Sequence, residues 1–96
     1  MIDKLLPYGT VVTLKGATRK LIIIGVFQKA EADGKIYDYC ACAYPVGYLN
    51  SDDIFLFNQD KIEKINFMGY TDEEVEDYLD DVLWEMNKNR EEDKNG

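Results

Sequence analysis

The sequence contains no histidine, and this absence excludes several kinds of catalytic site. Neither a Ser-His-Asp triad nor a Cys-His pair can be built from its residues, and the side chain that most often transfers protons near neutral pH is missing. Both glycine-rich phosphate-binding patterns, G-x-G-x-x-G and G-x-x-x-x-G-K-[ST], are also absent. We therefore expect a protein that is not an enzyme and that binds no cofactor.

Cysteine is scarce, since the chain has only Cys40 and Cys42, two residues apart in the segment YDYCACAYPVG. A structural zinc site takes four ligands, so a complete site here would require carboxylates or a second chain. A redox pair needs a thiol activated by a cation or a helix N-terminus, whereas the neighbouring charge is that of Asp38, which has the wrong sign. We interpret both cysteines as small apolar side chains of a strand and expect no metal.

Long apolar runs are missing too. The longest covers residues 21–24, far short of the roughly 20 residues that a membrane-spanning helix needs. The first residues show no pattern of a signal peptide, and two cysteines do not make a disulfide framework. These features predict a cytoplasmic protein without membrane insertion.

The net charge of −8 is concentrated in the last third of the chain. Residues 1–66 carry eight acidic and eight basic side chains, whereas residues 67–96 carry eleven acidic and three basic ones. Such a balance repels phosphate backbones and anionic lipid, so we expect no nucleic-acid partner, unless the acidic segment itself mimics a nucleic acid.

Short β-type runs and turn signals alternate through the first two-thirds of the chain. Asp33-Gly34 is a strong hairpin signal, Gly25 fits a bulge or a bend, and a single helical turn fits within residues 58–64. The expected strands are residues 10–14, 21–28, 35–44, 54–57 and 65–68. We predict an α+β fold: a small antiparallel β-meander or barrel-like bent sheet of about five strands, with one C-terminal amphipathic helix. Residues 1–90 form the single domain, and residues 91–96 a flexible polar tail.

Several signals predict where this helix begins and which face it buries. Thr71 is a suitable N-cap, Glu74 its capping-box partner, and Tyr70 with Val75 fits a hydrophobic staple. The apolar residues that follow recur with helical spacing and predict one core-facing stripe. Its members are Val75, Tyr78, Leu79, Val82, Leu83 and Met86.

Trp84 lies almost opposite the centre of that stripe, among acidic residues. We identify Trp84 as a candidate anchor for a protein partner, with Asp77, Asp80 and Asp81 steering a basic surface towards it. Two simpler interpretations stay open: a lone surface aromatic without a role, or a helix that ends early so that Trp84 folds back onto the sheet. The alternative binding surfaces are the sheet edge and the loop from Tyr44 to Tyr48.

Three sequence blocks resemble, in order and spacing, those of the DUF4176 family, a domain of unknown function in small Gram-positive proteins. They are LLPYGTVVTLKGATRKLIIIG, GKIYDYCACAYPVG and FLFNQDKIEKINFMGYTDEE, and the resemblance covers about residues 5 to 80. Two departures stand out: Val46 replaces a frequent acidic residue of the family and Tyr8 a frequent aliphatic one.

The resemblance implies a genomic context and carries no catalytic residues with it. Members are similar to proteins encoded in type VII secretion clusters, beside large toxins, so an accessory, chaperone-like adaptor for toxin export is the leading expectation. An immunity protein is the alternative, and a small enzyme is a more distant one. Two Y-x-x-x-[DE] matches, at Tyr48 and Tyr70, resemble export signals, but about 1.4 matches are expected by chance from this composition. Partner identity, a homodimer and export of the protein itself stay open.

Overall fold

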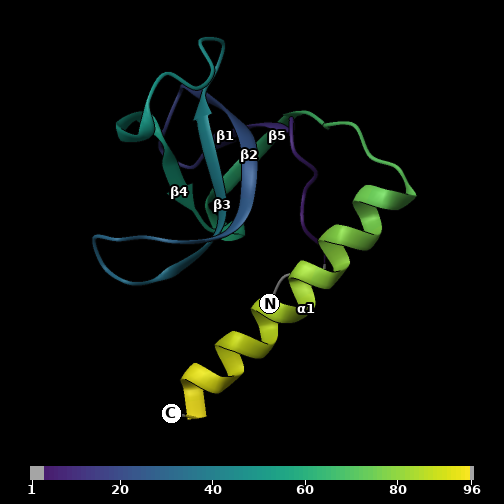
Figure 1. Ribbon diagram of the computed structural model, residues 1–96. Coiled ribbons are helices and arrows are strands. Elements are labelled where there is room, and N and C mark those ends of the chain that lie inside the picture. The colour runs from purple at the N-terminus through teal and green to yellow at the C-terminus, as the bar shows by residue number, and fades with distance from the viewer. Residues whose placement is uncertain (1–3, 96) are drawn as a thin grey trace.

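The computed structural model describes the backbone of residues 4–95 and the side chains of residues 4–90. Within this range it has one antiparallel sheet of five strands and a C-terminal helix, the α+β architecture that the sequence predicts. The strands are β1 (Val11–Leu14), β2 (Lys20–Lys29), β3 (Ile36–Ala43), β4 (Phe55–Phe57) and β5 (Ile62–Phe67), and the helix is α1 (Glu73–Asn95). The 3-10 turns η1 (Ser51–Asp53) and η2 (Gln59–Lys61) flank β4 (Figure 1).

The last strand departs from a simple meander. The sheet order is β4-β3-β2-β1-β5, so four strands follow chain order while β5 returns to pair with β1 instead of β4. The turn η2 redirects the chain, and Lys15 N donates to Lys61 O at 2.8 Å, which joins the end of β1 to this turn. The sheet is therefore open, with β4 and β5 as its edges. The expected meander is right for four strands and wrong for the fifth.

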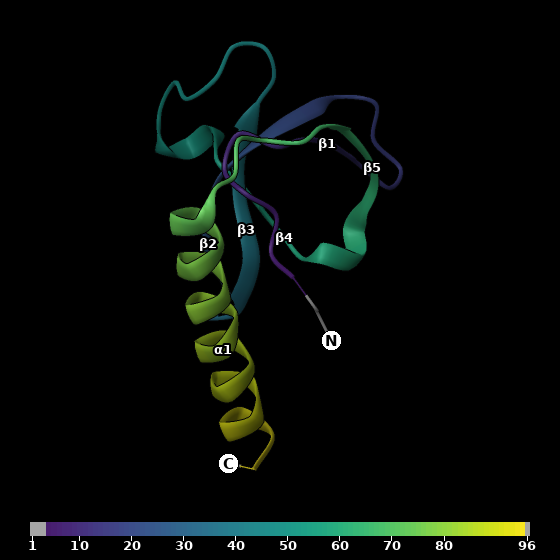
Figure 2. The same cartoon turned by 90° about the vertical axis from the view of Figure 1, so that its right-hand side faces the viewer.

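The sheet bends at β2, where the sequence places Gly25 inside an apolar run. The pairing of β2 with β3 shifts register between Ile23 and Gly25, which confirms the predicted irregularity. A Cβ atom at Gly25 would lie 2.7 Å from Cys40 Sγ, so a side chain at this position would have to displace the Cys40 thiol. Figure 2 shows the resulting curled sheet, with α1 alongside β2 and β3.

A buried crossing joins the segment before β1 to the segment after β5. Thr10 is fully buried, and its hydroxyl donates to Pro7 O at 2.7 Å and accepts from Gly69 N at 3.0 Å. A Cβ atom at Gly69 would lie 2.3 Å from Tyr8 O, so the two backbones meet without room for a side chain. This crossing fixes where α1 starts relative to the sheet.

Helix α1 begins one residue later than predicted. Asp72, not Thr71, caps it: Asp72 Oδ1 accepts from Val75 N at 2.9 Å, and Asp72 O accepts from Glu76 N at 2.9 Å. The helix also runs past residue 90, the expected end of the domain, since its backbone stays helical to Asn95. The side chains of residues 91–95 and all of Gly96 lie outside the described residues, and the expected flexibility of residues 91–96 stays a prediction.

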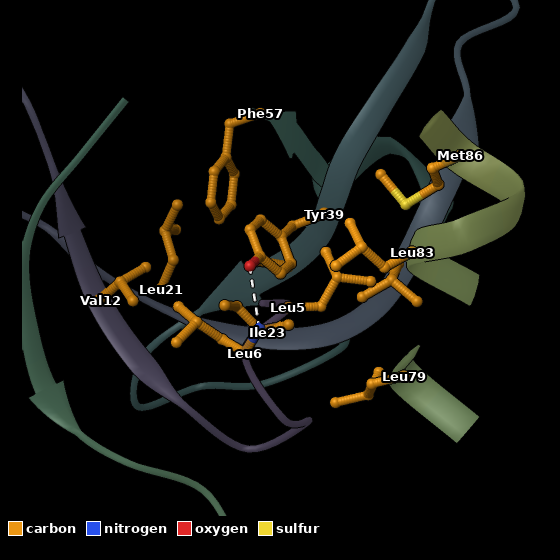
Figure 3. Packing of buried hydrophobic residues seen from close by; sticks show 12 residues of the cluster. Leu5, Leu6, Val12, Leu21, Ile23, Tyr39, Phe57, Leu79, Leu83 and Met86 are labelled. Atoms are coloured by element: carbon orange, nitrogen blue, oxygen red, sulfur yellow. Dashed lines mark hydrogen bonds between the residues drawn. The ribbon is translucent and has the colours of Figure 1, made fainter. Parts of the chain in front are cut away.

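The inner face of α1 closes the core. Leu79, Leu83 and Met86 are buried, Val75 and Val82 pack half-buried beside them, and the predicted stripe is confirmed at these positions. Figure 3 shows Leu83 and Leu5 beside the ring of Tyr39, with Leu79 and Met86 on the turns before and after. The other buried members of the cluster are Leu6, Val12, Leu21, Ile23, Val26, Ala41 and Phe57.

A buried carboxylate ties the second half of α1 to the sheet. Asp38 on β3 is 3% exposed, and its Oδ1 accepts from Arg90 Nη2 at 2.6 Å. Its Oδ2 accepts from Gln59 N at 2.7 Å, while Asp38 N donates to Asn58 Oδ1 at 3.0 Å. One side chain thus joins the helix, β3 and the turn η2.

Candidate protein-binding surface

The outer face of α1 carries an exposed tryptophan. Trp84 is 60% exposed, as its position opposite the buried stripe predicts, and it does not fold back onto the sheet. The Nζ atom of Lys88, one turn later, lies 5.0 Å from the ring centroid, a cation–π distance. A large aromatic ring held in solvent on a regular helix is a feature that a partner can cover.

The three predicted carboxylates lie within two turns of this tryptophan on α1. Asp80 and Asp81 precede it by one turn and Asp77 by two, and all three are exposed. Asp80 also lines a hollow of about 240 Å³ on the opposite flank of the helix, under the N-terminal segment of the chain. The structure therefore brings Trp84, Asp77 and Asp81 together on an open face, with Asp80 at its border. Their role in binding stays a prediction.

The loop with Tyr44 and Tyr48 forms a separate surface. Tyr44 is 43% exposed with Lys20 Nζ 5.6 Å from its ring centroid, and Tyr48 is 61% exposed. The loop caps one end of the sheet, whereas α1 runs down and beyond the other end (Figures 1 and 2). One small partner domain would not contact this loop and Trp84 through the same patch.

A second aromatic feature, which the sequence does not reveal, lies beside the start of α1. It is a groove of about 500 Å³ with a mostly apolar lining, which we call the tyrosine groove. Its lining residues are Tyr8, Tyr70, Glu74, Val75, Tyr78 and Leu79. The rings of Tyr8 and Tyr78 meet edge to face, with centroids 6.5 Å apart and planes at 83°.

Local contacts hold the walls of the tyrosine groove in place. The Tyr70 hydroxyl donates to Asp72 Oδ2 at 3.2 Å, so the residue that caps α1 also orients this ring. Tyr8 is fixed through its backbone, which crosses Gly69. Burial and the neighbouring Tyr78 phenol raise the pKa of Tyr8, and the hydrogen bond to Asp72 raises the pKa of Tyr70. Both phenols therefore stay neutral at physiological pH.

The groove corrects one member of the predicted stripe. Tyr78 was expected to face the core, but it is 53% exposed and leans against Tyr8 at the edge of the stripe. Tyr70 fitted a staple, and Tyr8 stood out only as a departure from the DUF4176 pattern. The three tyrosines belong to segments up to 70 residues apart, and only the crossing at Thr10 brings them together. No local sequence pattern carries that information.

The cysteines occupy the interior of β3, as predicted. Cys40 and Cys42 are buried free thiols, and burial together with the charge of Cys42 raises the pKa of Cys40. A raised pKa disfavours the reactive thiolate. In the part of the chain that the structure describes, no group of three or more Cys, Asp or Glu side chains is arranged to hold a metal ion. Nor is any described helix long and apolar enough to span a membrane.

Comparisons with known proteins agree with the pattern of the sequence blocks. Neither the curated proteins nor the solved structures yield a match to this chain. The pattern of the domain of unknown function DUF4176 matches residues 5–78, from the segment before β1 into the second turn of α1. This range includes the crossing and the tyrosine groove up to Tyr78, but not Trp84. The chain belongs to the DUF4176 family.

Proposed function

We propose that this protein is a non-enzymatic, cytoplasmic adaptor that binds another protein, in the manner of a chaperone for a type VII-secreted toxin. The observation that carries the proposal is the 60% exposure of Trp84 on an acidic helix face. Tryptophan is enriched among residues that dominate binding energy, and surrounding carboxylates favour a basic partner surface.

The attachment of α1 supports a binding role for its outer face. Leu79, Leu83 and Met86 bury the inner face, and Arg90 pairs with Asp38 further along. A helix that is held at several points loses little conformational freedom when a partner covers its other side. The entropic cost of binding is therefore smaller than for a mobile helix. Trp84 lies between these attachment points.

The type VII context comes from the resemblance of the sequence blocks to DUF4176 proteins, whose genes accompany large toxins. An adaptor and an immunity protein both bind a toxin, and an acidic face suits either. They differ in the region bound, because an adaptor contacts the targeting region and an immunity protein contacts the toxic domain.

Affinity purification from the native host, with the tagged full chain as bait, tests the proposal. We expect a type VII-secreted toxin of that host to co-purify, and truncated toxins to locate binding in the targeting region. Toxicity of the bound toxin should be unchanged. Binding to the toxic domain with loss of toxicity would establish the immunity alternative instead, and recovery of no toxin would contradict both.

A further inference from the structure

We propose that the tyrosine groove is a receptor for a lysine or arginine side chain, presented by a basic and otherwise apolar segment of the partner protein. This inference rests on the proposed protein-binding function and specifies the chemistry of the partner. It concerns a different surface from the one around Trp84.

The aromatic lining suits a cation. Tyr8 and Tyr78 stand nearly perpendicular at 6.5 Å, and Tyr70 supplies a third ring to the same groove. The faces of neutral tyrosine rings are electronegative and attract a cationic group within about 6 Å. In an edge-to-face pair the ring that presents its edge keeps its faces free of the other ring, so a planar guanidinium or an ammonium group can rest on such a face.

The charge around the groove selects a cation over an anion. Glu74 is the charged residue of the lining, Asp72 caps α1 beside it, and Asp77 follows on the next turn. The positive end of a helix dipole amounts to about half an elementary charge, which these carboxylates outweigh severalfold. Lys4 lies on the opposite flank, 3.8 Å from Glu76, in a side-chain pair too exposed to neutralise the groove.

The shape of the groove suits the rest of a basic side chain and a short length of its backbone. Val75 and Leu79 line it with aliphatic carbon, on which the methylene stem of lysine or arginine can pack while its charged end reaches Glu74. A volume of about 500 Å³ exceeds that of one side chain and falls within the usual range for ligand sites. The groove therefore has room for a basic side chain together with a short length of its backbone.

The groove and Trp84 are placed for one partner to contact both. Tyr78 and Trp84 are six residues apart on α1, which corresponds to about 9 Å along the axis and about 120° around it, so a partner would have to follow the exposed surface of the helix from one to the other. Asp77 and Asp81 lie on the exposed surface between them. A basic segment leaving the groove along the helix would pass over carboxylates before it reaches the tryptophan.

Two synthetic peptides test the inference on the full-length protein: acetyl-Ala-Leu-Lys-Leu-Ala-amide, and the same peptide with its lysine acetylated. Amide chemical shifts are followed by NMR as each peptide is added. We expect the lysine peptide to shift resonances of Tyr8, Tyr70, Glu74 and Tyr78, and to bind about tenfold more tightly than the acetylated one, a difference of about 1.4 kcal/mol. Equal binding of both peptides, or shifts confined to the loop from Tyr44 to Tyr48, would overturn the proposal.

Matched variants separate ring electrostatics from simple apolar contact. Tyr78→Phe keeps the aromatic face and should retain the preference for the lysine peptide, whereas Tyr78→Leu should lose most of it. Glu74→Gln should weaken the lysine peptide alone, and Tyr48→Leu serves as the unaffected control. An unchanged preference in both Tyr78→Leu and Glu74→Gln would contradict the inference.

The peptide titration and the toxin purification fail independently. If the toxin co-purifies but neither peptide distinguishes the groove, the adaptor proposal stands and this inference is wrong. If the lysine peptide binds the groove but no toxin is recovered, the groove is a receptor for basic segments and the proposed function is wrong.

Discussion

The inner face of α1 is structural, and its outer face carries the residues proposed to bind a partner. On the inner face Leu79, Leu83 and Met86 are 5%, 9% and 0% exposed, while on the outer face Tyr78 and Trp84 are 53% and 60% exposed. The same turns supply both sets, so backbone position alone does not distinguish them. Substitutions on the inner face should therefore affect stability, and substitutions on the outer face should affect the proposed binding.

The largest effect is expected from the inner face. Leu79→Ala should lower the free energy of unfolding by about 2 to 5 kcal/mol, because it removes buried methyl groups from the seam between α1 and the sheet. Val82→Ala should cost less, since Val82 is only half-buried. Chemical denaturation measures both, with the exposed Glu85→Ala as control. Unchanged stability of Leu79→Ala would show that the helix does not pack on the sheet.

The next effect concerns the polar attachment of the inner face. Arg90→Ala leaves the Asp38 carboxylate, whose side chain is 4% exposed, without its cationic partner. Breaking a buried ion pair lowers the free energy of unfolding by about 3 to 5 kcal/mol. We expect Arg90→Ala to lower it by about 3 kcal/mol or less, because the Arg90 side chain is 36% exposed. Lys88→Ala is the control on the outer face. Equal stabilities of these two variants would mean that Arg90 and Asp38 do not interact in solution.

A buried phenol beneath the helix gives a pH-dependent test. The Tyr39 hydroxyl accepts from Leu6 N at 2.9 Å and donates to Gln59 Oε1, so Tyr39→Phe should cost about 1 to 3 kcal/mol at pH 7. Burial raises the pKa of Tyr39 to about 12, above its usual value near 10. The folded state therefore holds the phenol proton more tightly than the unfolded state does. The protonated phenol contributes fully to the free energy of unfolding below pH 10, and this contribution is lost as the pH rises to 12.

The difference in stability between the wild-type protein and Tyr39→Phe should therefore shrink between pH 10 and pH 12. Taking the difference cancels the titration of the other tyrosines, including Tyr8. Urea unfolding at several pH values supplies the measurement. A difference that stays constant up to pH 12 would show that the Tyr39 phenol is not buried.

Local patterns predicted the elements of this fold well. Four strand runs, the hairpin at Asp33-Gly34 and the irregularity at Gly25 reappear in the structure. The fifth strand starts at Ile62 instead of residue 65, and the helical stripe reappears without Tyr78. The cap shifted by one residue because Thr71 and Asp72 are both good capping residues, and only the hydrogen bond from Val75 N to Asp72 distinguishes them. Such signals act over a few residues, and the sequence displays them directly.

Features that join distant segments were not predictable. The pairing of β5 with β1, the contact of Arg90 with Asp38 and the gathering of three tyrosines depend on the path of the chain. Hydrophobic periodicity marks which face is buried but not which element covers it. The candidate site also has a predictable and an unpredictable part. Helical periodicity predicts that Trp84 is exposed, whereas the tyrosine groove depends on the crossing between the segments before β1 and after β5.

The smallest effect on stability, and the decisive one for binding, is expected from Trp84→Ala. The side chain is 60% exposed, and Lys88 lies over its ring. The free energy of unfolding should therefore change by no more than about 0.5 kcal/mol. Capture of the proposed protein partner should weaken by about tenfold or more, since a partner-covered tryptophan is worth at least about 1.4 kcal/mol. Charge reversal at Asp77, Asp80 and Asp81 should slow association mainly, with an effect that shrinks as salt is added. Undiminished capture by Trp84→Ala would remove the anchor and leave the tyrosine groove, the sheet edge and the Tyr44–Tyr48 loop as the surfaces to test next.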